Sequence, residues 1–144
     1  MNIDIWMDVR CPFCYIEKKN FELALNNFKY KDKVILIWHS FELDPKLKTD
    51  IEIDTQEPLP HRNKILKEQA ASMQRAITLG KEIGIDFNFG KLIMANSFNA
   101  HKLIQFAKSD GVAAEAFESL FKNYFSEGKN IDDLETLLAI GISL

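Results

Sequence analysis

The sequence has few of the residues on which several classes of protein depend. It contains two cysteines and three histidines in 144 residues, and its net charge is only −3. A chain of this length can bury a real core, so it does not need disulfides as staples. It has no block of five or six like charges that would recruit nucleic acid or an anionic membrane. It also has no run of about 18 apolar residues of the kind that spans a bilayer.

The first residues, MNIDIW, lack the features of a secretory leader. They include no basic segment, no apolar stretch and no small-residue cleavage site. We therefore expect a cytoplasmic protein. In a reducing compartment, two cysteines close in sequence are more often catalytic or metal-binding than a structural disulfide.

The amino-terminal part predicts a strand, a helix and a second strand. Ile3, Ile5 and Met7 alternate with more polar residues, which indicates a short strand. A helix is expected to begin at Cys11-Pro12, since proline suits the first helical turn. Cys14, Phe21, Leu25 and Phe28 would share its buried face. The apolar run 34–38 (VILIW) is typical of a parallel strand buried on both faces.

The rest of the chain is predicted to be mostly helical. A polar, proline-containing loop is expected at 44–60, and alternating apolar residues at 85–89 favour a short extended piece. The expected helices span 65–84, 96–109, 112–127 and 132–140, and glycines follow the second and third of these. In the third of these four helices, the residues expected to pack inward are Phe117, Leu120, Phe121, Tyr124 and Phe125.

The sequence Cys11-Pro12-Phe13-Cys14 is the strongest candidate for a functional site. Two cysteines three positions apart at a helix start can form a disulfide without movement of the backbone. The first sulfur would meet free N–H groups and the positive end of the helix dipole, which lowers a thiol pKa. Cys11 is thus the predicted nucleophile and Cys14 the resolving thiol. The intervening Pro12-Phe13 pair would influence the direction of electron flow.

The cysteine pair has three other interpretations. A zinc site would require two further ligands, and His39, His61 and His101 lack the usual close spacing. Inert core thiols are common, but the preceding strand and the proline favour redox chemistry. A structural disulfide is disfavoured by the expected compartment. Neither a metal nor an organic cofactor is therefore expected.

The cysteine motif belongs to a longer pattern. Residues 8–16 (DVRCPFCYI) resemble the DsbA-like proteins of the FrnE type, and the resemblance continues at 41–45, 96–101 and 124–131. It implies an α/β, thioredoxin-like fold with a helical insertion. It also implies thiol–disulfide oxidoreductase or isomerase activity. On this basis we expect residues 1–45 to form the first βαβ half and 46–144 to form the loop and insertion.

The resemblance also implies partners and modulators. Protein thiols and disulfides, or glutathione, are the expected substrates. Relatives with serine at the first cysteine position are glutathione-dependent isomerases or transferases, and others are redox-silent adaptors. Both remain alternatives for this chain. Arg10, Glu17, where the family commonly has glycine, and His101 are the candidate modulators of the cysteines.

Family members continue beyond the region matched here with two further strands, a final helix and a cis-proline loop. The prolines at 12, 45, 58 and 60 do not occupy that loop position. We therefore expect a fold without those carboxy-terminal strands. Exposed sheet edges then predict self-association.

Overall fold

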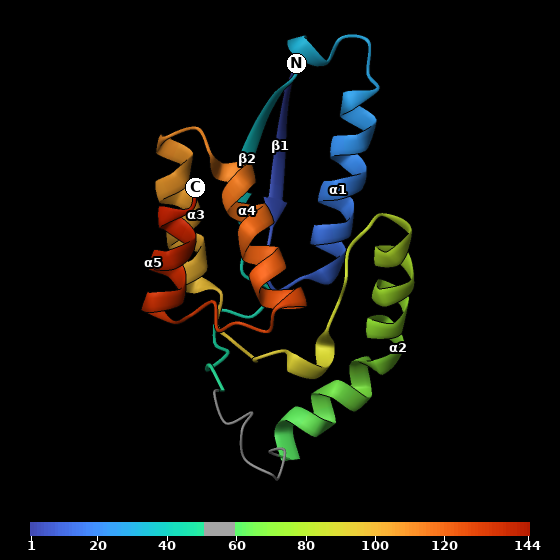
Figure 1. Cartoon of the computed structure of the whole chain (residues 1–144), viewed down its shortest axis with the longest axis vertical. Helices are drawn as coiled ribbons and strands as arrows, with labels where there is room; N and C mark the ends of the chain where they lie inside the picture. The colour runs from blue at the N-terminus through green and yellow to red at the C-terminus, as the bar shows by residue number, and fades with distance from the viewer. Residues whose placement is uncertain (51–59) are drawn as a thin grey trace.

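The computed structural model describes the backbone of residues 1–50 and 60–144, and the side chains of 1–50 and 67–144. Strands β1 (Asn2–Met7) and β2 (Ile35–Ser40) form a parallel pair in which Ile5 is opposite Trp38. They are joined by helix α1 (Pro12–Asn26) and a short 3₁₀ turn, η1 (Lys31–Lys33). In the view of Figure 1, α1 and α2 lie to the right of the two strands, and α3 and α5 lie to their left. The predicted βαβ unit is confirmed.

The two faces of this sheet differ sharply. Met7 and Trp38 point into the core and are almost fully buried, whereas Trp6 and Ile35 on the other face are each 60% exposed. The prediction that the second strand is buried on both faces is therefore wrong. Although the sequence of β2 is apolar, no described segment covers the face on which Ile35 lies.

Helix α1 also buries a different face from the one predicted. Its buried residues are Tyr15, Ile16 and Lys18, while Phe28 lies beyond the helix end and is 44% exposed. The residues of the predicted stripe do have helical spacing. However, α1 packs through Tyr15 against a later helix that carries Phe121. The sequence of α1 alone could not show this partner.

The remaining described elements are mainly helices. Glycines at 84, 111 and 128 have φ between +69° and +79° and follow the ends of three helical segments, a conformation that favours glycine. The elements are α2 (Pro60–Glu82), η3 (Phe89–Lys91), α3 (Phe98–Ser109), α4 (Ala113–Phe121), η4 (Lys122–Ser126) and α5 (Leu134–Ile142). The four predicted helices are confirmed, with α4 continuing into η4 as a π-helical turn. The part of the predicted 44–60 loop at 51–59 lies outside the described residues.

The piece predicted to be extended at 85–89 has no regular secondary structure at 85–88, and Phe89 begins η3. Phe87 stacks on Phe89 with ring centroids 5.3 Å apart, and both rings meet Phe125 edge-on. Packing against the aromatic helix, and not pairing with another strand, explains the apolar alternation. An isolated β-bridge nearby joins Asp50 to Met94.

The core is centred on α4 and η4. Phe117, Phe121, Tyr124 and Phe125 are at most 1% exposed, as their spacing predicted. Tyr15 from α1 stacks on Phe121 at 4.8 Å. Since aromatic contacts of this kind combine large buried area with a preferred geometry, they fix α1 against the helical part of the molecule.

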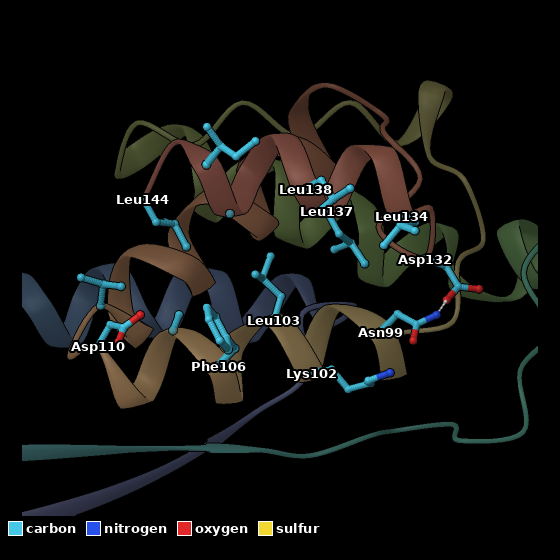
Figure 2. Close-up of a pocket in the computed structure, with 14 residues that line it drawn as sticks. Asn99, Lys102, Leu103, Phe106, Asp110, Asp132, Leu134, Leu137, Leu138 and Leu144 are labelled. Carbon is cyan, nitrogen blue, oxygen red and sulfur yellow. Dashed lines mark hydrogen bonds between the residues drawn. The ribbon is translucent and has the colours of Figure 1, made fainter.

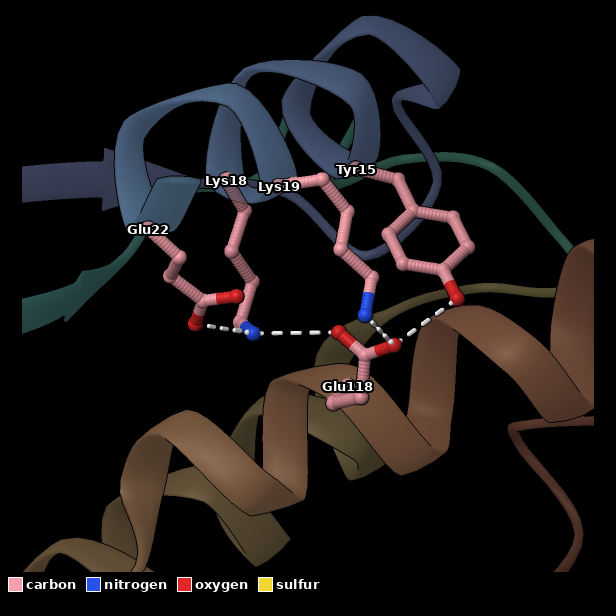
Figure 3. Close-up of polar contacts among 5 residues, drawn as sticks. All are labelled: Tyr15, Lys18, Lys19, Glu22 and Glu118. Carbon is pink, nitrogen blue, oxygen red and sulfur yellow. Dashed lines mark hydrogen bonds and ion pairs between the residues drawn. The ribbon is translucent and has the colours of Figure 1, made fainter. Parts of the chain in front are cut away.

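A charged cluster supports the same contact between α1 and α4 (Figure 3). The Lys18 ammonium, on a side chain only 2% exposed, lies 2.6 Å from a carboxylate oxygen of Glu22 and 3.0 Å from one of Glu118. Lys19 pairs with Glu118 at 2.6 Å, and the Tyr15 hydroxyl donates to the same carboxylate at 3.0 Å. The helix that carries the cysteines is thus tied to α4 by charge as well as by packing.

Candidate active site

The two cysteines lie at the start of α1, directly after the carboxyl end of β1. Cys11 is the residue that precedes the first helical turn, and Pro12 begins the helix. The Cys11 backbone N–H donates to the carbonyl of Asp8 at 3.0 Å, which forms the tight turn between strand and helix. The local sequence therefore places the Cys11 sulfur where the orphan N–H groups of α1 converge.

The surroundings of the two thiols make them unlike one another. A hydrogen bond from the Cys14 thiol, together with the backbone N–H groups of Phe13 and Cys14, lowers the pKa of Cys11 to about 6 against the opposing effect of burial. The same hydrogen bond, and then burial, strongly raise the pKa of Cys14. Both side chains are partly accessible. The arrangement favours a Cys11 thiolate that is accessible to solvent and held by a protonated Cys14.

Asp8 anchors the segment around the cysteines. Its carboxylate, on a residue 1% exposed, accepts the backbone N–H of Arg10 at 3.0 Å and that of Leu43 at 2.7 Å. Burial raises the pKa of Asp8, but the contact with His101 and these backbone hydrogen bonds outweigh it, so the pKa lies below its usual value. The buried carboxylate thus stays charged, and its field raises the pKa of Cys11 and of Cys14.

His101 extends from α3 to this carboxylate. Its Nε2 lies 3.4 Å from the Asp8 Oδ1, and the His101 side chain is 6% exposed. At that distance the two groups are in ion-pair range but do not make a well-formed hydrogen bond. Neither ring nitrogen of His101 has a hydrogen-bond partner among the described residues. The contact joins the helical part of the chain to the turn that precedes the cysteines.

Arg10 lies between the cysteine turn and η4. Burial raises the pKa of Tyr124, and the nearby Arg10 guanidinium opposes this effect. The Arg10 Nε is buried and has no hydrogen-bond partner among the described residues. Arg10 therefore supplies a positive charge to the wall of the site, although its effect falls on Tyr124 and not on the Cys11 thiol.

A cavity of about 400 Å³ opens beside Cys11, within the range of small-ligand pockets. It is bounded by the β1–α1 turn, by the segment after β2, by α2 and by η4. Its lining is mostly apolar and includes Arg10, Cys11, Phe13, Leu43, Leu47, Met73, Phe89, Leu92, Met94 and Phe125. Such a pocket can hold the part of a substrate that flanks a reacting sulfur.

The structure separates the predicted modulators. Arg10 and His101 lie within the site, whereas Glu17 is exposed on α1. The carboxylate that acts on Cys11 is that of Asp8. Its role was missed because the motif shows only that Asp8 precedes Cys11 by three positions. Leu43 and Tyr124 were likewise missed, since nothing in the sequence shows that distant segments line the same cavity.

A larger pocket, of about 790 Å³, lies between α3 and α5 and contains neither cysteine. Figure 2 shows Leu103 and Phe106 pointing from α3 towards Leu137 and Leu138 of α5, with Asn99 donating to Asp132 at one end. Phe106 is 71% exposed and Leu138 55%. The pocket is an apolar groove with few groups that could take part in catalysis.

The described part of the chain has neither a metal cluster nor a membrane-spanning helix. No three histidine, cysteine, aspartate or glutamate side chains gather there in a way that could hold a metal ion. None of the described helices is both long and apolar enough to cross a membrane.

Comparison with known proteins assigns the family. The model of the DSBA-like thioredoxin domain matches residues 2–144. The chain therefore belongs to the DSBA-like thioredoxin domain family, and the predicted fold class is confirmed. The FrnE subtype remains a prediction.

The similar proteins are longer than this chain. A probable DsbA oxidoreductase from Streptomyces coelicolor is 26% identical with a TM-score of 0.82, and the match covers 99% of this chain and 62% of that one. The uncharacterized protein YwbO of Bacillus subtilis is 27% identical over 139 residues, which is 95% of this chain and 62% of YwbO. The cytosolic disulfide reductase DsbM of Pseudomonas aeruginosa shares the fold, with 16% identity, a TM-score of 0.68 and coverage of 99% and 63%. DsbM is also known in a structure with GSH, at 15% identity, a TM-score of 0.66 and coverage of 99% and 64%. The chain thus spans about three fifths of the relatives it matches.

Proposed function

We propose that this chain carries out thiol–disulfide exchange through Cys11 and Cys14, with Cys11 as the nucleophile. The observation that carries the proposal is the position of the two cysteines at the start of α1, with Cys11 directly before the first helical residue. There the hydrogen bond between the two thiols lowers the pKa of Cys11 to about 6 and raises that of Cys14. An exchange catalyst needs this asymmetry because one sulfur must attack as thiolate while the other waits as thiol. Membership of the DSBA-like family agrees with it.

The exchange proceeds in two displacements. The Cys11 thiolate attacks one sulfur of a substrate disulfide, so a Cys11–substrate disulfide forms and the other substrate sulfur leaves as a thiolate. Cys14 then loses its proton to solvent and attacks the Cys11 sulfur. The second substrate sulfur leaves, a Cys11–Cys14 disulfide remains, and two electrons have passed to the substrate. The reverse sequence oxidises a dithiol.

Glutathione is the small partner we propose for the cavity beside Cys11. The cavity volume of about 400 Å³ suits a small flexible thiol, and the Arg10 guanidinium on its wall can bind a carboxylate. DsbM, which shares the fold, has been solved with GSH and is named as a cytosolic protein. A cytoplasmic location, and reduction of protein disulfides at the expense of glutathione, follow as proposals for this chain.

Trapping of the mixed disulfide tests this function. Cys14→Ser removes the resolving thiol, so exposure to oxidised glutathione should leave one glutathione on Cys11, visible in the intact mass. Cys11→Ser is the matched control, because it keeps one thiol on the same turn but leaves only Cys14, whose pKa burial still raises. We expect rapid adduct formation in the first variant and slow formation in the second. Equal rates in the two variants would contradict the assignment of Cys11 as nucleophile.

We also propose that the chain self-associates through its sheet. In the described residues the sheet has two strands, and two strands leave unpaired N–H and C=O groups at their outer edges. Trp6 and Ile35 add exposed apolar surface on the face of those strands. Light scattering after gel filtration at micromolar concentration should give a mass above that of one chain. A Trp6→Lys variant should lower that mass, and a single-chain mass for the unmodified protein would overturn the proposal.

A further inference from the structure

His101 is a buried ionisable residue that the exchange mechanism above does not use. It comes from α3, about ninety positions from the cysteines, yet its ring lies in ion-pair range of the Asp8 carboxylate. Both ring nitrogens are buried without a hydrogen-bond partner among the described residues. Such orphaned polar atoms are rare in protein interiors and call for a specific explanation.

Asp8 connects this histidine to the reacting sulfurs. The Asp8 backbone holds the turn, since its carbonyl accepts the N–H of Cys11 at 3.0 Å. Its charged carboxylate is buried beneath the same turn and disfavours negative charge on both sulfurs. Any group that neutralises Asp8 therefore makes a thiolate at Cys11 easier to form. His101 is placed to do so, because a protonated imidazole is the one cation in contact with that carboxylate among the described residues.

We propose that His101 is a positioning residue for the exchange reaction, acting through Asp8: its ring, 3.4 Å from the buried carboxylate beneath the cysteine turn, controls how strongly that carboxylate opposes a thiolate at Cys11. This inference rests on the proposed function, since it concerns the reactivity of the same thiol. It gives a function to the contact between His101 and Asp8, which joins the helical part of the chain to the cysteine turn.

The direction of the effect follows from the charges. When His101 carries its proton, the pair Asp8–His101 is neutral and opposes the Cys11 thiolate only weakly. When the ring is neutral, the full charge of Asp8 acts on Cys11 and the thiolate fraction falls. A variant without the ring should thus react more slowly than the natural protein wherever the ring carries a proton, and at the same rate wherever it does not.

Other ionisable groups border the Asp8–His101 pair. From the β1–α1 turn these are Arg10, Cys11 and Cys14, and from η4 it is Tyr124. The neighbour from α4 is the uncharged ring of Phe117, 6.5 Å from the His101 ring between centroids. None of these groups contributes a second histidine, so an ionisation removed by replacing His101 can be assigned to it.

A second histidine–aspartate pair provides the control. His39 Nε2 lies 2.7 Å from the Asp4 Oδ1, and the His39 ring stacks on Trp6 on the exposed face of the sheet. Neither residue contributes to the perturbation of the cysteine thiols. His39→Gln therefore removes a histidine from the same kind of pair without touching the charge beneath Cys11.

The test is the rate at which iodoacetamide alkylates Cys11 in the reduced full chain, measured between pH 5 and pH 9 with thiolate absorbance followed in parallel. His101→Gln should slow alkylation about threefold or more near pH 6 and leave the rate above pH 8 unchanged, while His39→Gln follows the natural protein throughout. Asp8→Asn should speed alkylation at low pH, and adding His101→Gln to it should have little further effect, since the histidine acts through Asp8. Circular dichroism checks that each variant is folded.

Two results would overturn the inference. One is a profile for His101→Gln that coincides with that of His39→Gln. The other, which needs no variant, is a profile of the natural protein that fits a single thiol ionisation. Either result leaves the proposed function intact if oxidised glutathione still forms an adduct on Cys11. Conversely, oxidised glutathione could form no adduct on Cys11 while His101→Gln still slows alkylation. That result would reject the proposed function and not the role of His101.

Discussion

The Lys18 ammonium of α1 and the Glu118 carboxylate of α4 lie 3.0 Å apart although the residues are separated by 100 positions. Lys18 is nearly enclosed, and Glu118 also receives Lys19 and the Tyr15 hydroxyl. Burial alone would raise the pKa of Glu118, but these two lysines together lower it. The contact therefore helps to hold α1, the helix that carries Cys14, in a fixed orientation against α4.

Replacing Glu118 should destabilise the fold because the buried Lys18 ammonium loses one of its two carboxylate partners. We expect Glu118→Gln to lower the free energy of unfolding by about 1–2 kcal/mol at pH 7, less than for a fully buried pair because the carboxylate is partly exposed. The folded-state pKa is lowered, so this contribution is present above the usual glutamate range and is lost as pH falls through the folded value. Urea unfolding at pH 7 and at pH 3 measures both effects.

Glu115 is the matched control for this variant. It lies one turn earlier on the same helix and is exposed. Glu115→Gln should therefore change stability by less than about 0.5 kcal/mol. Equal losses for the two variants would show that the buried contact with Lys18 adds nothing.

The low pKa of Cys11 should depend on the Cys14 thiol. Cys14→Ala removes the hydrogen-bond donor, so the Cys11 pKa should rise clearly above about 6, whereas Cys14→Ser keeps a donor and should raise it less. Thiolate absorbance against pH measures both. The lowered pKa of Cys11 also affects stability, because the folded chain favours the thiolate more than the unfolded chain does. The reduced chain should therefore gain stability relative to its Cys11→Ser variant as pH rises from about 6 towards the ordinary thiol pKa of 9.0. An unchanged Cys11 titration in the alanine variant would contradict the account.

The turn after η4 should require glycine more strictly than the turn after α3. Gly128 has φ +69°, and a Cβ there would approach the backbone oxygen of Lys91 to 2.6 Å; Gly111 has φ +79° with open space around it. Gly111→Ala should cost about 1 kcal/mol for the backbone conformation alone. Gly128→Ala should cost distinctly more, since Lys91 must also move. Thermal unfolding of the two variants gives the comparison, and equal losses would argue against the close approach.

Arg10 should distinguish charged from neutral small disulfides. In the Cys14→Ser background, Arg10→Gln should slow adduct formation by oxidised glutathione about tenfold, as expected for losing one charge-assisted hydrogen bond of about 1.4 kcal/mol. Adduct formation by uncharged hydroxyethyl disulfide should change much less, which separates recognition from any general change in Cys11 reactivity. Arg75→Gln, on exposed α2 surface outside the cavity, is the control. A similar loss with both disulfides would remove Arg10 from glutathione recognition.

Sequence patterns predicted the features that depend on local chemistry. The position of Cys11 before a proline-initiated helix, and the buried face from Phe117 to Phe125, follow from spacing and propensity that neighbours in sequence determine. The strand β2 was misjudged because burial of Ile35 depends on whether another segment covers it. For Phe87 and Phe89 the sequence did not show the packing partner, since their alternation suits an aromatic helix as well as it would a strand.

The site was only partly accessible to the same reasoning. Cys11 and Cys14 are neighbours on one helical turn, so their relation could be foreseen. Asp8, His101 and Leu43 meet only after three separate segments fold together, and their distances in sequence give no sign of it. The apolar wall of the cavity was hidden for the same reason, because its residues resemble ordinary core residues in any local window.

A glutathione redox titration of the purified chain tests the central claim most directly. Thiols are trapped after equilibration at each ratio of reduced to oxidised glutathione, and the intact mass counts the free cysteines. We predict a reversible two-electron transition between a dithiol and a Cys11–Cys14 disulfide within the range of biological glutathione potentials. Cysteines that stay reduced at every ratio would contradict the account and favour a redox-silent binding role for this fold.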